Sequence, residues 1–125
     1  MKTIIATPEA PAAIGPYSQA VEAGGFMFIS GQLPVNPATG NMEGTDTAGQ
    51  TEAVINNIAA ILRSRGLSLA SVVKTTVFMT DLKEFQKMNE VYARFFTGNP
   101  PARATIEVKA LPKSALVEIE AIAVK

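Results

Sequence analysis

Apolar positions between Asp46 and Arg65 recur every three or four residues, which is the spacing of a helix that buries one stripe of its surface. The stripe consists of Val54, Ile55, Ile58, Ile61 and Leu62. Residues 45–47 (Thr, Asp, Thr) are all suitable N-caps, and Gly66 stands where a left-handed residue ends a helix. The pattern therefore predicts a first helix over 46–65.

A second stretch with helical spacing runs from Leu82 to Phe96. Its apolar stripe consists of Phe85, Met88, Tyr92 and Phe95. Asp81 can cap the start, and the Gly98–Pro101 segment is incompatible with a continuing helix. Asn89 interrupts this apolar stretch with an amide.

The remaining apolar runs are short and rich in β-branched residues, which is typical of strands. The predicted strands are Lys2–Ala6, Gln19–Glu22, Phe26–Ser30, Val72–Met79, Ala102–Val108 and Ala115–Val124. The order is three strands, a helix, a strand, a helix and two strands. It predicts an α/β protein of one domain, residues 1–125, with both helices on one face of the sheet.

Composition excludes several kinds of site. The 125 residues include no Cys and no His, so disulfides, thiol nucleophiles, Cys/His zinc sites and Ser-His-Asp triads are impossible. Eleven basic and eleven acidic residues cancel, which disfavours a nucleic-acid groove or a membrane-surface site. No apolar window suits a signal peptide or a membrane span, so we expect a cytoplasmic protein.

The last two predicted strands place charged side chains on one face. Alternation in the final strand assigns its apolar set to the helices: Val117, Ile119, Ala121 and Ala123. In the strand before it, the same criterion assigns Ala104, Ile106 and Val108 to the core and leaves Arg103, Thr105 and Glu107 on the helix-free face. If these strands pair antiparallel, Thr105 faces Glu118 and Arg103 faces Glu120, or Arg103 lies diagonal to Glu118 after a two-residue slip.

The helix-free face also receives Leu116, Ile122 and Val124, so it would expose apolar surface in a monomer. Such a surface predicts a homo-oligomer, with the charged patch in or beside the interface. A buried Arg103 then needs a carboxylate, from protein or from a ligand. An Arg–Glu pair on neighbouring strands is more often a structural ion pair than a site, and the pattern alone leaves both interpretations open.

The residues of this patch belong to a longer set of motifs that resembles the RidA family of enamine/imine deaminases. The motifs are Pro101–Val108, Leu111-Pro112, Val117–Glu120, Ala13–Gln19, Ser30–Gln32, Val73–Phe78, Asn89 and Tyr92–Phe96. Several separate motifs in the same order over almost the whole chain make this resemblance specific. One departure is Thr105, where the family frequently has Cys; Thr removes any thiol role but keeps a hydrogen-bonding group.

The resemblance implies a chorismate-mutase-like fold, with a mixed sheet, and a homotrimer with clefts between subunits. It implies hydrolysis of 2-aminoacrylate-type enamines and imines to 2-keto acids and ammonia, without cofactor or metal. By position, Arg103 would hold the substrate carboxylate and Glu118 would orient or deprotonate water. Tyr17, Ser30, Gly31, Asn89 and Thr105 would line the substrate cleft.

An alternative function uses the same residues. A non-catalytic trimer could sense a small 2-keto acid or similar carboxylate in that cleft and regulate a partner. Gripping an anion needs the same guanidinium in both cases, so the sequence does not separate the two functions. Neutral net charge argues against a third function, RNA binding or cleavage.

Overall fold

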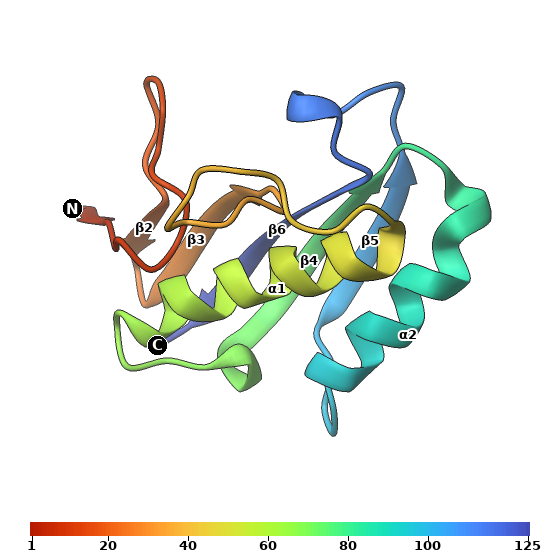
Figure 1. Cartoon of the computed structure of the whole chain (residues 1–125). Helices are drawn as coiled ribbons and strands as arrows, with labels where there is room; N and C mark the ends of the chain where they lie inside the picture. The colour runs from red at the N-terminus through yellow and green to blue at the C-terminus, as the bar shows by residue number, and fades with distance from the viewer.

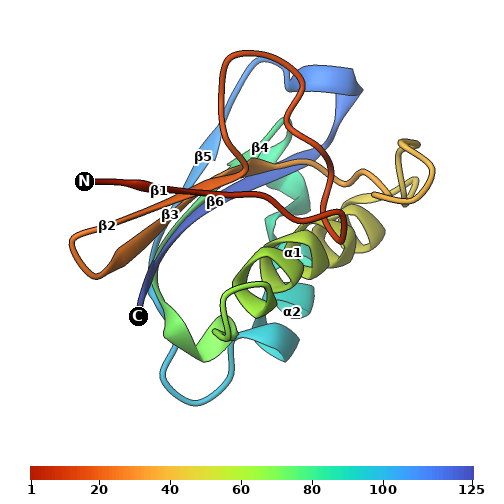
Figure 2. The ribbon, with the colours of Figure 1, turned by 90° about the vertical axis from the view of Figure 1, so that its left-hand side faces the viewer.

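The computed structural model describes residues 1–125, in which six strands form one sheet with both helices packed on one face (Figure 1). The strands are β1 (Thr3–Ile5), β2 (Ala20–Ala23), β3 (Phe26–Gln32), β4 (Val72–Met79), β5 (Ala102–Glu107) and β6 (Val117–Val124). The helices are α1 (Thr47–Arg63) and α2 (Phe85–Phe95). Figure 2 shows α1 and α2 on the same side of the sheet, as the order of elements predicts.

The strand order across the sheet is β1-β2-β3-β6-β4-β5. All neighbours are antiparallel except β4 and β5, which are parallel because α2 crosses between them. The predicted pairing of the last two strands is therefore wrong: β4 lies between β5 and β6. The crossover places β5 on the sheet edge, and β6 fills the gap between β3 and β4.

The pairing with β4 also reverses the predicted faces of β5. Arg103 is in register with Thr75, and Thr105 with Val77; both β4 residues are fully buried under the helices. Paired residues share a face, so Arg103 and Thr105 lie on the helix side of the sheet. Ala104 and Ile106 consequently lie on the helix-free face, where Ile106 is 45% exposed, and Val108 is not part of the core cluster.

The core fills the space between the helices and the sheet. The predicted stripe of the first helix is buried, as are the four predicted residues of β6, namely Val117, Ile119, Ala121 and Ala123. Leu116 differs from its prediction, since it precedes β6 and packs against this core instead of facing the helix-free side. Its backbone N–H donates to Gln50 Oε1 on α1, which holds it there.

Capping residues mark both ends of α1 and the turn that leads into α2. The Asp46 carboxylate accepts a hydrogen bond from the backbone N–H of Gly49, which satisfies a free donor of the first turn of α1. At the other end Gly66 adopts a left-handed φ of 73°, as its position in the sequence predicts. Asp81 caps a 3-10 turn, Leu82–Glu84, from which α2 continues.

The helix-free face is partly apolar and open. Phe26, Phe28 and Val124 are each at least 40% exposed on β3 and β6, and Ile106 adds a fourth exposed apolar side chain on β5. Of the three apolar residues that the sequence assigns to this face, Val124 is exposed there and Ile122 is partly exposed, whereas Leu116 is not on it; the homo-oligomer remains a prediction. Neither α1 nor α2 combines the length and hydropathy of a membrane-spanning helix.

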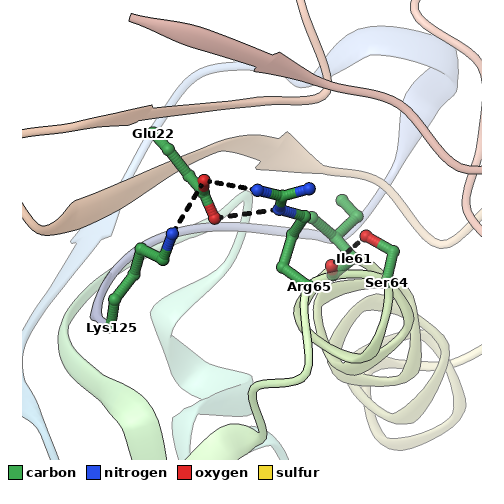
Figure 3. A network of polar contacts seen from close by, with 5 residues as sticks. All are labelled: Glu22, Ile61, Ser64, Arg65 and Lys125. Carbon is green, nitrogen blue, oxygen red and sulfur yellow. Dashed lines mark hydrogen bonds and ion pairs between the residues drawn. The ribbon is translucent and has the colours of Figure 1, made fainter.

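A cluster of charged side chains joins three distant parts of the chain (Figure 3). Glu22 on β2 accepts two hydrogen bonds from Arg65, just after α1, and one from Lys125 after β6. The Glu22 side chain is only 7% exposed. The hydrogen bonds and charge of Arg65, followed by those of Lys125, outweigh burial and lower the pKa of Glu22 below its usual 4.5.

Candidate functional site

Arg103 lies in β5, at the sheet edge covered by α2. Its guanidinium carbon is 4.7 Å from the centre of the Tyr92 ring and 5.5 Å from that of Phe85. One guanidinium nitrogen, Nη1, donates a hydrogen bond of 2.7 Å to Asn89 Oδ1. These three α2 residues are spaced i, i+4 and i+7, so they form one stripe facing Arg103.

Arg103 has no carboxylate partner within the chain. The ion pairs present are those of Glu22 with Arg65 and Lys125, and that of Lys87 with Glu84. Arg103 is half-buried and held by neutral groups. A guanidinium that is partly removed from water without a counter-ion favours an added carboxylate or phosphate oxygen.

Glu118 occupies the other face of the sheet, next to a bulge in β3. Ile29 pairs with Ala121 and Gln32 with Ile119, so Ser30 and Gly31 together oppose a single residue of β6. The Glu118 carboxyl lies directly over Gly31, where a Cβ atom would collide with Oε2. Only glycine leaves room for this carboxyl position.

The environment of Glu118 favours its protonated form. Burial raises the pKa of Glu118 above the usual 4.5, and the negative charge of Glu120 raises it further. No ion pair within the chain offsets these effects. A carboxylate with a raised pKa is a stronger base and accepts a proton from water more readily.

Ser30 belongs to the bulge beside Glu118, and Tyr17 lies in the loop that precedes β2. Ser30 Oγ donates a 2.6 Å hydrogen bond to the carbonyl of Ser18, which ties the loop to the bulge. Tyr17 is 54% exposed, and its hydroxyl accepts a hydrogen bond from the backbone N–H of Ile14. The Gln19 side-chain amide, with four hydrogen bonds to Thr7, Ala10 and Pro11, fixes the same loop.

The predicted site residues thus form two groups. The arginine half consists of Asn89, Arg103 and Thr105 on α2 and β5. The glutamate half consists of Glu118, of Gly31 and Ser30 in the bulge beside it, and of Tyr17 in the loop that the Ser30 hydroxyl ties to the bulge. Because the halves lie on opposite faces of one sheet, the predicted patch uniting Arg103 and Glu118 on the helix-free face is wrong for a single chain. A hollow of about 590 Å³ touches Tyr17 but neither Arg103 nor Glu118.

Phe85 and Tyr92 belong to the arginine half, a role that their positions in the predicted apolar stripe and, for Tyr92, in the Tyr92–Phe96 motif do not indicate. A signal was present: Asn89 stands between two aromatic residues at helical spacing, where a buried stripe would carry an apolar side chain. Elsewhere, no set of three carboxylates converges in a way that could ligate a metal ion.

Known proteins match this chain over its full length. The family model described as Endoribonuclease L-PSP matches residues 7–125. A RutC family protein of Pyrococcus horikoshii is 53% identical over 100% of this chain and 99% of its own length. The chloroplastic Reactive Intermediate Deaminase A of Arabidopsis thaliana is 46% identical over 98% of this chain and 65% of that protein.

Solved structures also match the fold of this chain. The crystal structure of E. coli TdcF with bound serine superimposes with a TM-score of 0.94 at 45% identity, covering 98% of both chains. This agreement confirms the chorismate-mutase-like α/β fold that the sequence motifs imply. The chain therefore belongs to the Endoribonuclease L-PSP family, which includes the RutC and Rid proteins that its motifs resemble.

Proposed function

We propose that this protein is a hydrolytic deaminase of 2-aminoacrylate-type enamines and imines, which it converts to 2-keto acids and ammonia. The observation that carries the proposal is the half-buried Arg103 guanidinium, held by neutral side chains with no carboxylate partner. Two relatives add support: one is a Reactive Intermediate Deaminase and the other binds serine, an amino acid that carries a carboxylate.

Arg103 suits the carboxylate of such a substrate. Guanidinium carries five N–H donors in a planar fork, and Asn89 accepts from only one nitrogen. The remaining donors can form two parallel hydrogen bonds to a carboxylate, a geometry that lysine does not offer. Thr105 adds a hydroxyl on the same face of β5.

Glu118 suits the hydrolytic step, but it belongs to the opposite face of the sheet. We therefore assign the complete site to a cleft between two copies of the chain, with Arg103 from one protomer and Glu118 of the partner subunit. A homotrimer with three such clefts satisfies this arrangement by a cyclic contact. The exposed apolar residues of the helix-free face, Phe26, Phe28, Ile106 and Val124, would be covered by the same association.

The chemistry needs only these groups and water. In the iminium form, the substrate carbon bears a carboxylate and a C=NH2⁺ bond and is already electrophilic. Glu118 takes a proton from water as the oxygen bonds to that carbon, giving a carbinolamine. The protonated Glu118 then returns the proton to the amino nitrogen. Unprotonated again, Glu118 takes the hydroxyl proton as the C=O bond forms and the C–N bond breaks, and it passes this proton to the departing ammonia. One water and one iminium ion thus become one keto acid and one ammonium ion.

The first test compares single variants. The protein should accelerate keto acid release from 2-aminoacrylate generated by a dehydratase. Arg103→Ala should lose binding of pyruvate and most turnover, and Glu118→Gln should keep pyruvate binding but lose turnover by about 10²–10⁴-fold. Unchanged turnover in Arg103→Ala contradicts the carboxylate clamp. Pyruvate binding by a wild-type protein that accelerates nothing would assign the non-catalytic function instead.

The second test addresses the shared cleft. Arg103→Ala and Glu118→Gln chains, each inactive alone, are co-expressed with two different tags and purified as mixed oligomers. If each site takes its two side chains from different copies, every cyclic trimer that contains both chains has one of its three clefts with both native residues, so about one third of wild-type turnover is expected. Recovery near that fraction is the expected result, and no recovery from a confirmed mixed oligomer contradicts the shared site.

A further inference from the structure

Two aromatic side chains of α2, Phe85 and Tyr92, contact the Arg103 guanidinium. Resting on the role proposed for Arg103, we propose that Phe85 and Tyr92 are positioning residues that hold its guanidinium for the substrate carboxylate. We call the two rings together with Asn89 the aromatic cradle. None of these three α2 side chains carries a charge, and all three contact the same guanidinium.

The cradle restrains a side chain that is otherwise flexible. Tyr92 and Phe85 each attract the cation through the negative face of the ring, at 4.7 and 5.5 Å from guanidinium carbon to ring centre. Asn89 Oδ1 fixes one nitrogen at 2.7 Å. Ordering an arginine side chain costs conformational entropy. Because the contacts with α2 already order Arg103 in the free protein, ligand binding does not have to offset that cost.

Aromatic rings hold the guanidinium without neutralising it. An Asp or Glu at position 85 or 92 would fix Arg103 equally well, but the incoming carboxylate would then have to displace it. The rings leave the positive charge uncompensated and most N–H donors free. The fold therefore fixes the position of the cation and keeps its charge for a ligand anion.

The Tyr92 ring is itself held by the core. Its hydroxyl lies 2.7 Å from Thr75 Oγ1, a fully buried residue of β4, and its ring packs 4.4 Å from that of Phe96. Burial raises the pKa of Tyr92, against smaller lowering effects of the Thr75 hydrogen bond and the Arg103 charge. The phenol stays neutral in the physiological range, so Tyr92 contacts Arg103 as an uncharged ring.

Phe85→Leu separates positioning from folding, because Phe95 offers a matched control. Both phenylalanines are on α2 and half-buried against the same core cluster, but only Phe85 contacts Arg103. We expect Phe85→Leu to weaken pyruvate binding about 10-fold, measured by calorimetry, and to raise KM by a similar factor with kcat nearly unchanged. Phe95→Leu should leave both the Kd and KM at wild-type values.

Tyr92 variants provide the second measurement. Tyr92→Phe keeps the ring and removes the hydrogen bond to Thr75, so it should lower Tm while pyruvate binding stays within about 2-fold of wild type. Tyr92→Leu should weaken binding at least as much as Phe85→Leu. If Tyr92→Leu does not fold, the comparison of Phe85→Leu with Phe95→Leu decides.

The outcomes distinguish this inference from the function on which it rests. If Arg103→Ala abolishes pyruvate binding but Phe85→Leu leaves it unchanged, the role of the aromatic cradle is refuted and the role of Arg103 as carboxylate clamp stands. Pyruvate binding that Arg103→Ala leaves unchanged overturns the proposed function itself. Equal losses in Phe85→Leu and Phe95→Leu would indicate a general effect on α2 and also overturn the cradle.

Discussion

Replacing Gly31 with alanine should remove most of the turnover while leaving the chain folded. An added Cβ would stand 2.9 Å from Cδ and 3.3 Å from Cγ of Glu118, and closer still to Oε2. Carbon atoms pack at about 3.5–4.0 Å, so the carboxyl group has to move. The group in the way is the far end of a flexible side chain, which can rotate toward solvent.

The expected cost in stability is small. Gly31 is not among the glycines with a left-handed φ, so alanine fits the backbone. At such positions Gly→Ala stabilises by about 0.4–1 kcal/mol through the unfolded chain. Rotating Glu118 costs about 0.5–1.5 kcal/mol if it leaves its rotamer well. These effects oppose each other, and we expect a free energy of unfolding within about 1 kcal/mol of wild type.

The expected cost in catalysis is large, because a displaced carboxylate no longer positions water. Turnover of dehydratase-generated 2-aminoacrylate should fall about 10²–10⁴-fold, the usual contribution of a general base. The double variant Gly31→Ala/Glu118→Gln should be no slower than the slower single variant, since both changes remove the same function. A folded Gly31→Ala protein with wild-type turnover would show that the position of Glu118 over Gly31 is irrelevant to catalysis.

Three further predictions concern stability. The pKa of Glu22 is lowered on folding, so its ion pairs stabilise the protein above the unfolded pKa near 4.5 and are lost as pH falls through the lower, folded pKa. Glu22→Gln should therefore lower Tm at pH 7, and the difference from wild type should close as the pH falls from 4.5 through the folded pKa. The pKa of Glu118 is raised, so its ionisation opposes folding above pH 4.5. The Tm of Glu118→Gln at pH 7 should therefore equal or exceed that of wild type, and a marked drop in Tm would refute the raised pKa. Asn57 donates hydrogen bonds to two backbone carbonyls and is 5% exposed. Asn57→Ala should lower the free energy of unfolding, measured in urea, by about 2–3 kcal/mol. A loss below about 0.5 kcal/mol would mean that water replaces both hydrogen bonds.

The periodic elements could be predicted because local patterns specify them. The helical stripe, the Asp46 cap and the left-handed Gly66 all appear where spacing and residue type place them. The strand Val72–Met79 is observed with its predicted bounds. In each case the information lies within one turn or one strand of the sequence.

The strand that pairs with β5, and the face of the sheet on which each β5 side chain lies, could not be predicted in the same way. Sequence neighbours often pair, but the β4–α2–β5 crossover takes β5 to the far side of β4. Alternation fails there because both faces of β5 are mixed: Ile106 is an apolar residue on the open face, and Arg103 is a cation on the helix face. The aromatic residues of α2 make the helix face suitable for a guanidinium, and that contact arises only in three dimensions.

The position of β6 has a consequence for how this chain folds during synthesis. The strand follows every other element in the sequence, yet it pairs with β3 on one side and β4 on the other. Until the ribosome has released it, the β1–β3 meander and the β4–β5 pair share no strand that joins them, and each has an unpaired edge. The sheet can therefore be completed only after translation of residues 117–124, and a nascent chain stalled before them would expose two edges on which other chains could aggregate.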